Sequence, residues 1–172
     1  MDADVKYNFK WKDLGDIAEG RPTLGPTTQV AVYRLLQFTL RDVLDKRYGP
    51  ERTNDIFIQA GYKAGKEFCN NIVDIKLDFS GFIADLTEKF LKFGIGVLRV
   101  EKAEMDTMSF ILTVSEDLDC SGLPVSGMVF CDYDEGFISG ILNAYTGKNF
   151  RVKEVDCWGT GERTCRFTVD LI

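Results

Sequence analysis

The hydrophobic pattern changes its period near residue 95, and this change constrains the fold more strongly than any other feature of the chain. Upstream of it, apolar residues recur every three or four positions, which predicts three helices over residues 28–47, 50–71 and 79–93. Downstream of it, apolar and polar residues alternate, which is typical of two antiparallel strands over residues 96–105 and 107–117. In the first helix, the apolar residues that fall near one face are Val30, Leu35, Leu36, Leu40, Val43 and Leu44.

The rest of the chain continues this mixed order. A loop over residues 117–127 precedes a predicted helix at 127–146, and the segments 149–157 and 164–172 read as a closing hairpin. The regular βαβ alternation of a parallel sheet is missing from the pattern. The sequence therefore predicts an α+β fold in which an antiparallel β-sheet packs against several α-helices.

The chain shows no internal repeat, low-complexity tract or linker. A length of 172 residues suits one continuous core, so we expect a single domain over residues 1–172. The segment VKYNFKWK, residues 5–12, has the pattern of a strand. We therefore expect residues 1–19 to form an N-terminal extension or an edge strand.

Two glycine pairs stand one turn apart inside predicted helices: Gly61 with Gly65, and Gly136 with Gly140. A glycine inside a helix costs roughly 1 kcal/mol relative to alanine. Close contact with another backbone or with a ligand would explain these residues, and a tolerated weakness is the alternative.

The charge pattern narrows the classes of partner. The net charge is −6, and no basic block interrupts the sequence. This argues against nucleic-acid binding and against adhesion to anionic membranes. The first residues lack the apolar core of a signal peptide, and no apolar run reaches the ~20 residues of a membrane span. We therefore expect a cytoplasmic protein whose thiols stay reduced.

The chain contains five cysteines and no histidine. The missing histidine excludes a Ser–His–Asp triad, a Cys–His pair and any metal site with histidine ligands. Any metal must then be held by cysteine, aspartate or glutamate. An odd number of cysteines in a reducing compartment favours metal binding, catalysis or core packing over a disulfide framework.

Cys157 and Cys165 flank the turn of the closing hairpin, in the stretch EVDCWGTGERTCRF. A disulfide, a redox pair and a metal site all fit this spacing, and the reducing compartment favours the metal. Zinc takes four tetrahedral ligands. Glu154 would supply an oxygen, and Cys131 is the best candidate for the fourth ligand because a helix N-terminus favours its thiolate. The resulting set is Cys131, Glu154, Cys157 and Cys165.

The pleat of the strand restricts this ligand set. Side chains alternate along a regular strand, so Glu154 and Cys157 would point to opposite faces. Both reach one ion only if the strand is irregular between them. We therefore predict a one-residue bulge near Val155–Asp156.

The same residues carry a resemblance to a known family. Cys131, the GF-x-x-G pattern at 136–140, Glu154-x-x-Cys157 and Cys165-Arg-Phe167 resemble the 4-vinyl-reductase domain over about residues 20–172. The chain is similar to the sensor domains of phenol- and xylene-responsive activators, to small stand-alone archaeal proteins, and more distantly to a trafficking subunit of the TRAPP complex. In the phenol sensors, three cysteines and one glutamate hold a zinc ion. The resemblance therefore implies the same four ligands and a structural zinc.

The resemblance also implies a sensor-like function. It suggests a homodimer and an internal pocket that binds a small hydrophobic or aromatic molecule, with the signal passed to a separate partner. The reductase in the family name makes an enzyme or accessory factor one alternative, although we find no cofactor motif and assign no catalytic residue. A scaffold subunit is the other alternative. The candidate pocket residues are Tyr33, Phe38, Phe57, Tyr62, Phe82, Phe90 and Phe110.

Two cysteines stand outside the ligand pattern. Cys69 lies beside Phe68 on the second predicted helix, and we expect it in the core. Cys120 lies in the loop after the second strand and receives no role, except in an iron–sulfur site, which would recruit it as a further thiolate.

Overall fold

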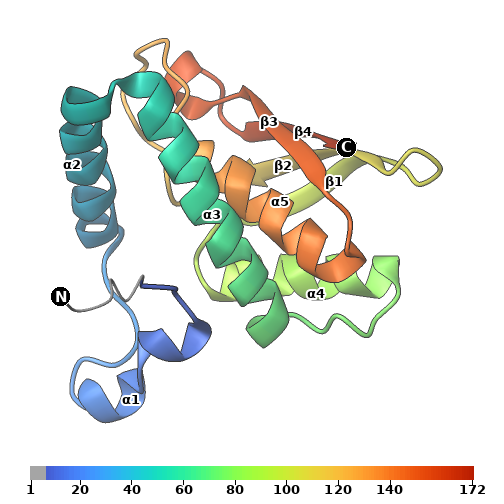
Figure 1. Ribbon diagram of the computed structural model, residues 1–172, viewed down its shortest axis with the longest axis horizontal. Coiled ribbons are helices and arrows are strands. Elements are labelled where there is room, and N and C mark those ends of the chain that lie inside the picture. The colour runs from blue at the N-terminus through green and yellow to red at the C-terminus, as the bar shows by residue number, and fades with distance from the viewer. Residues whose placement is uncertain (1–6) are drawn as a thin grey trace, which may run out of the picture.

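The computed structural model describes residues 7–172, and within them it confirms the predicted α+β fold (Figure 1). The helices are α1 (Ile17–Gly20), α2 (Val30–Tyr48), α3 (Pro50–Ile72), α4 (Phe79–Lys92) and α5 (Asp132–Thr146). The strands are β1 (Val97–Glu104), β2 (Ser109–Ser115), β3 (Phe150–Asp156) and β4 (Cys165–Leu171). Short 3₁₀ turns lie at η1 (Trp11–Leu14) and η2 (Trp158–Thr160).

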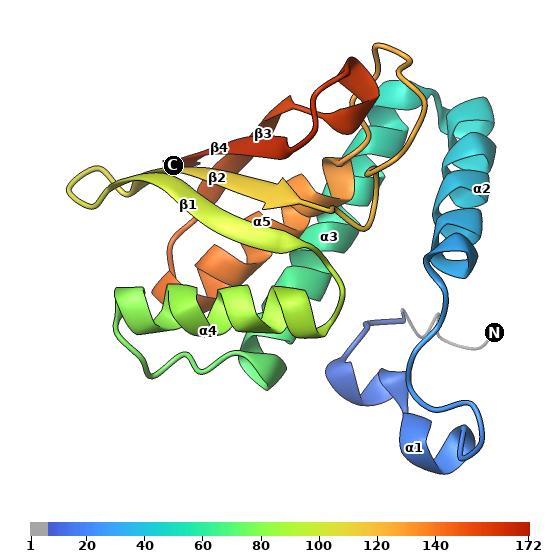
Figure 2. The same cartoon turned by 180° about the vertical axis from the view of Figure 1, so that it is seen from behind.

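The strands form one antiparallel sheet in the order β1-β2-β4-β3 within the described residues. Helices α4 and α5 cover one face of this sheet, and α3 packs on the far side of α5 (Figure 2). Alternate residues of the last strands point into this layered core, including Phe150 and Val152 on β3 and Phe167 and Val169 on β4. The hairpin that carries the candidate ligands is therefore half buried, as its pattern predicts.

The glycine pairs mark the closest contact between two helices. A Cβ atom added to Gly61 or Gly65 of α3 would collide with backbone carbonyl groups of α5. The converse holds for Gly136 and Gly140, whose added Cβ atoms would collide with carbonyl groups of α3. Of the two explanations offered by the sequence, backbone contact is the correct one, because only glycine lets the two helix axes approach so closely.

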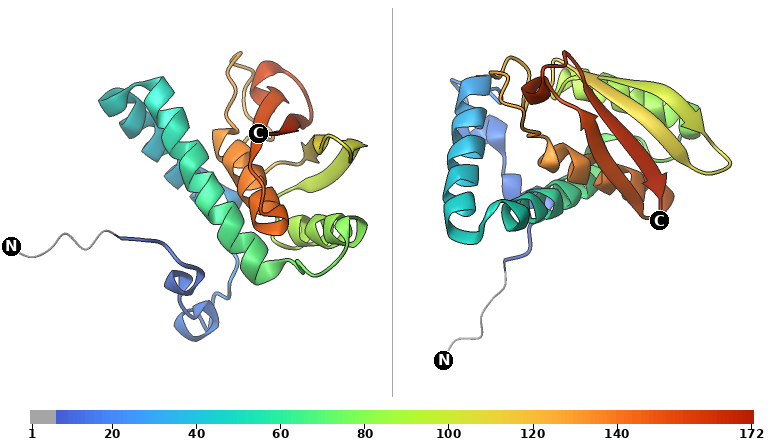
Figure 3. Two further views of the ribbon diagram at one scale, coloured as in Figure 1. Left: turned by 45° about the vertical axis from the view of Figure 1, so that its right-hand side comes forward. Right: turned by 90° about the horizontal axis from the view of Figure 1, so that it is seen from above.

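The apolar side of α2 does not face the core. Gln37 is buried, whereas Val32, Leu35, Leu36 and Val43 are each more than half exposed. Figure 3 shows α2 at the outer side of α3, away from the sheet. The helical period of this segment was predicted correctly, but the pattern alone does not say which layer covers the apolar face.

The predicted N-terminal strand is wrong over the described part of residues 5–12. Residues 1–6 lie outside the described part, and the chain from Trp11 to Leu14 forms a 3₁₀ turn. Asp13 Oδ2 accepts a hydrogen bond from the Lys10 N–H at 2.9 Å, and Asp16 caps the short α1 helix. Such local side-chain bonds compete with strand pairing.

Among residues 7–172, no helix combines the length and the apolar character that a membrane crossing needs.

Candidate metal centre

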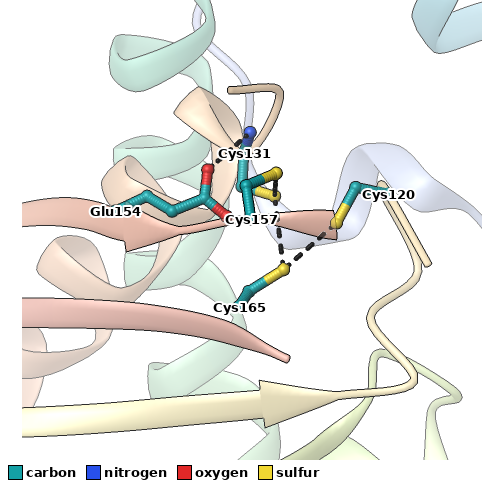
Figure 4. A group of neighbouring side chains, drawn as sticks. All are labelled: Cys120, Cys131, Glu154, Cys157 and Cys165. Carbon is teal, nitrogen blue, oxygen red and sulfur yellow. Dashed lines mark hydrogen bonds between the residues drawn. The ribbon is translucent and has the colours of Figure 1, made fainter. Parts of the chain in front are cut away.

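Four cysteines and one glutamate meet at the end of the sheet (Figure 4). Cys120 comes from the loop after β2, Cys131 caps α5, Glu154 lies on β3, and Cys157 and Cys165 flank the hairpin turn. One donor atom from each lies within 4.8 Å of all the others, and all five residues are buried. The structure thus brings together the four predicted ligands and adds Cys120, which the sequence left without a role.

The sulfur separations match the size of a single-ion site. Four sulfurs at ~2.3 Å from one ion lie ~3.8 Å apart in a tetrahedron. The Cys131 sulfur lies 4.0 Å from that of Cys157 and 3.8 Å from that of Cys165. The Cys120 sulfur is closer to Cys165, at 3.1 Å. A four-iron cluster would hold its cysteine sulfurs farther apart, because irons and sulfides lie between them.

The predicted irregularity of β3 is confirmed. Glu154 pairs with Phe167 and Asp156 pairs with Arg166, so the register shifts across Val155. This bulge lets the side chains of both Glu154 and Cys157 reach the cluster.

The predicted start of the helix at residue 127 is wrong, because α5 begins at Asp132. The N–H groups of Ser126 and Gly127 donate to the Gly159 carbonyl at 2.9 and 3.0 Å. These bonds hold the chain before α5 against the hairpin turn and keep it out of the helix. Cys131 is therefore the N-cap residue rather than a member of the first helical turns, and its carbonyl accepts the first helical bond from Glu135.

Glu154 lacks a full set of hydrogen-bond partners. Its Oε2 atom accepts a long bond of 3.4 Å from the Cys131 N–H, and its buried Oε1 atom has no partner among residues 7–172. Burial raises the pKa of Glu154 to about 8. A buried carboxylate oxygen without a partner, aimed at three thiols, suits a cation.

Further buried acids surround the cluster. Burial, followed by repulsion from Asp119, raises the pKa of Asp117 to about 7. Burial also raises the pKa of Asp134 well above its usual range, and its Oδ2 atom has no partner among residues 7–172. The nearest strong ion pair joins Arg41 to Asp132, at 2.8 Å. This corner of the core is therefore rich in negative groups and favours a bound cation.

The loop before Cys120 is held by three side chains of α2. Tyr33 donates to Asp119 Oδ1 at 2.8 Å, and Gln37 donates to Asp119 Oδ2 at 2.6 Å. Arg34 donates to the Leu118 carbonyl at 2.8 Å. We refer to these contacts between α2 and residues 117–119 as the α2 clamp. They fix the outer helix to the metal cluster by polar contacts rather than by apolar packing.

A local turn then aims Cys120 at the cluster. Asp117 Oδ1 accepts hydrogen bonds from the N–H groups of Asp119 and Cys120, at 2.9 and 3.0 Å. This turn depends on the α2 clamp, which joins segments far apart in sequence. The only sequence signal for Cys120 was the fifth, unassigned cysteine beside two aspartates.

Cys69 lies elsewhere, fully buried in α3, as predicted. Burial raises the pKa of its thiol to about 11. This thiol is part of the core and not of the cluster.

A small apolar cavity lies between α4, α5 and the strands β1 and β2. Its volume is about 20 Å³, room for about one water molecule, whereas ligand pockets usually span ~300–1,000 Å³. The lining residues are all apolar: Phe79, Ile83, Leu86, Phe90, Leu98, Phe110, Leu112, Ile138, Ile141 and Leu142.

Two of the seven candidate pocket residues, Phe90 and Phe110, line this cavity. Phe82 is buried beside it and stacks on Tyr145 with ring centroids 3.8 Å apart. The other four lie outside the cavity: Tyr33 in the α2 clamp, Phe38 against Phe130, Phe57 under Arg41, and Tyr62 beside Lys66.

The comparisons with known proteins agree with the resemblance described above. Residues 110–171, from β2 to β4, match the family of the 4-vinyl-reductase domain, and this stretch contains all four predicted zinc ligands. Two proteins of Methanocaldococcus jannaschii are similar over most of the chain. Uncharacterized protein MJ0150 is 25% identical over 99% of this chain and 94% of its own length. Uncharacterized protein MJ1642 is 28% identical over 87% of this chain and 81% of its own length.

Solved structures share the fold at low sequence identity. The phenol-responsive sensory domain of the transcription activator PoxR, solved with phenol, has a TM-score of 0.66 and 16% identity over 84% of this chain and 75% of its own. A trafficking protein particle complex subunit 3 from Naegleria fowleri, covalently bound to palmitic acid, has a TM-score of 0.66 and 16% identity over 83% of this chain and 95% of its own. A vinyl-4-reductase family protein from Methanocaldococcus jannaschii has a TM-score of 0.58 and 16% identity over 87% of this chain and 85% of its own. The resemblance and the fold class predicted from the sequence are thus confirmed.

Proposed function

We propose that the protein is a sensor-like, small-molecule-binding domain with a structural zinc ion. The observation that carries this proposal is the apolar cavity enclosed by α4, α5 and the sheet. Structures that share the fold include one solved with phenol and one bound to palmitic acid, which supports an apolar or aromatic ligand. The whole chain would form one domain, in the reducing cytoplasm that free thiolate ligands require.

The cavity must widen to take a ligand. About 20 Å³ cannot hold an aromatic ring, so an incoming ligand has to displace side chains such as Phe79 and Ile83, which are only partly buried. Because the lining is apolar, it recognises a hydrocarbon part of the ligand by burial of surface rather than by hydrogen bonds.

The zinc ion would be held by Cys131, Glu154, Cys157 and Cys165. Four protein ligands leave no open position for a catalytic water, so the ion is structural. It would join the loop before α5 to the β3–β4 hairpin, and its binding free energy would add to the stability of the fold. The partnerless Oε1 atom of Glu154 and the tetrahedral sulfur spacing support this assignment.

Methyl NMR tests the ligand proposal with toluene and palmitic acid as probes. We expect saturable shifts confined to cavity methyl groups, such as those of Ile83, Leu86 and Ile138. The Ile83→Trp variant fills the cavity and should abolish these shifts. Leu91→Trp, on the exposed side of the same helix, should leave them unchanged. Shifts that do not saturate, or that persist in Ile83→Trp, would contradict the proposal.

The exposed side of α2 favours a second function, assembly into a homodimer. Val32, Leu35, Leu36 and Val43 present an apolar surface to solvent, and such surfaces mark interfaces. A second copy of this chain is the occupant we propose, since two-fold assemblies are the commonest. A separate signalling partner would then read the state of the dimer.

Sedimentation measures this assembly. We expect a dimer that dissociates when Leu35 and Leu36 are both changed to lysine. Leu91→Lys, a change of equal chemistry at another exposed leucine, is the control and should stay dimeric. A wild-type monomer at high concentration would exclude the dimer without affecting the ligand proposal.

A further inference from the structure

Cys120 is the one member of the cluster that the zinc proposal does not use. Its side chain is fully buried, and its sulfur lies 3.1 Å from the sulfur of Cys165. A structural zinc ion takes four ligands, and Cys131, Glu154, Cys157 and Cys165 already supply them. Cys120 is therefore left as a free thiol in contact with a sulfur that holds the ion.

We propose that Cys120 and Cys165 form a redox pair that releases the zinc ion when a hydroperoxide oxidises it. This inference rests on the zinc site of the proposed function. It adds a modification site, a regulated disulfide, that a purely structural zinc does not have.

The distances select this pair over the others. A disulfide needs its sulfurs at ~2.05 Å, so the sulfurs of Cys120 and Cys165 must approach by about 1 Å. The separations from Cys131 to Cys157 and to Cys165, 4.0 and 3.8 Å, require about twice that movement. Cys131 is also fixed as the cap of α5, whereas Cys120 lies in a loop.

The loop also provides a route for a small oxidant. Residues 124–129, which follow Cys120 in this loop, are all exposed. Local opening of such a segment costs less than global unfolding and would bring Cys120 into contact with solvent. Cys165 has no such route of its own, because it is paired within the sheet.

The chemistry balances in two steps. First, the Cys120 sulfur attacks the hydroperoxide, the O–O bond breaks, and a sulfenic acid and an alcohol form. Second, the Cys165 sulfur leaves zinc and attacks the Cys120 sulfur, so an S–S bond forms and the S–O bond breaks. With one proton from solvent, the second step releases water. The two sulfurs lose two electrons and the peroxide gains them, and zinc loses one of its four ligands.

Zinc release from the loaded protein tests this inference. Hydrogen peroxide is added, released zinc is followed with a chromogenic chelator, and disulfides are mapped by mass spectrometry without reduction. We expect a Cys120–Cys165 linkage that appears together with free zinc, and recovery of the site after dithiothreitol and zinc are added. The Cys120→Ser variant should retain one zinc and release it about tenfold more slowly, because the resolving partner is gone.

Two controls keep the outcomes separate. Cys69→Ser, a buried thiol outside the cluster, should behave like the wild type. Equal release rates in Cys120→Ser, or a linkage between other cysteines, would overturn the redox pair. Loss of zinc from untreated Cys120→Ser, with its circular dichroism unchanged, would make Cys120 a ligand and also overturn it. A wild-type protein without zinc would instead refute the proposed function.

Discussion

Gly136 of α5 lies directly against the backbone of Ile58 in α3, and a Cβ atom at this glycine would overlap the Ile58 carbonyl group. This contact sets the distance between the two helices. It thereby sets where α5 presents Cys131 to the hairpin.

The first prediction concerns this contact. Gly136→Ala should lower the free energy of unfolding by about 1–3 kcal/mol or more, because the helices must separate to admit the methyl group. Gly20→Ala is the matched control, since an added Cβ there meets nothing within 4 Å and should change stability little. Chemical denaturation measures both, and equal stabilities would show that the helices are not in backbone contact.

The second prediction concerns the α2 clamp. Tyr33→Phe removes the hydrogen bond to a buried Asp119 oxygen and should cost about 1–3 kcal/mol of stability. Tyr48→Phe, on the exposed end of the same helix, is the control. Hydrogen exchange should also show faster exchange in α2 for Tyr33→Phe alone. An unchanged exchange pattern would mean that the clamp does not hold α2.

The third prediction concerns the pH dependence of zinc binding. Burial raises the pKa of Glu154 to about 8, so the carboxyl group of the metal-free protein carries a proton at lower pH. Zinc must displace this proton, and affinity should therefore rise with pH from about 6 to 8. In Glu154→Gln, the slope of log affinity against pH should fall by up to about one. Competition with a chelator at several pH values measures the slope, and an unchanged slope would remove Glu154 from the ligands.

The fourth prediction concerns the apolar cavity. Leu86 is buried and lines it, so Leu86→Ala should cost about 2–5 kcal/mol of stability. The same change enlarges the cavity and should strengthen binding of toluene. Leu91→Ala, at an exposed position of the same helix, should stay within about 0.5 kcal/mol of the wild type and bind toluene as the wild type does. Weaker binding by Leu86→Ala would place the ligand elsewhere.

Local pattern predicted most of the elements, because helices and strands follow the spacing of neighbouring residues. The bulge at Val155 was predictable for the same reason, since two ligands on one strand had to face one point. The errors come from contacts between distant segments. The chain before Asp132 stays out of α5 because its N–H groups bind Gly159, and no local pattern records that bond.

The candidate site shows the same limit. The four expected ligands stood in a recognisable spacing, and the structure brings them together. Cys120 could not be placed from sequence, because its loop is held by side chains of α2 from a distant part of the chain. The aromatic residues were poor guides to the cavity for a related reason. Apolar stripes show which residues are buried, but only the packing of α4 on the sheet shows which of them enclose a space.

Native mass spectrometry with elemental analysis tests the central claim, the structural zinc site, most directly. We predict one zinc ion per chain in the wild type and in Cys69→Ser, and its loss in Cys157→Ser together with a lower unfolding temperature. A wild-type protein that is fully folded and free of metal would contradict the account.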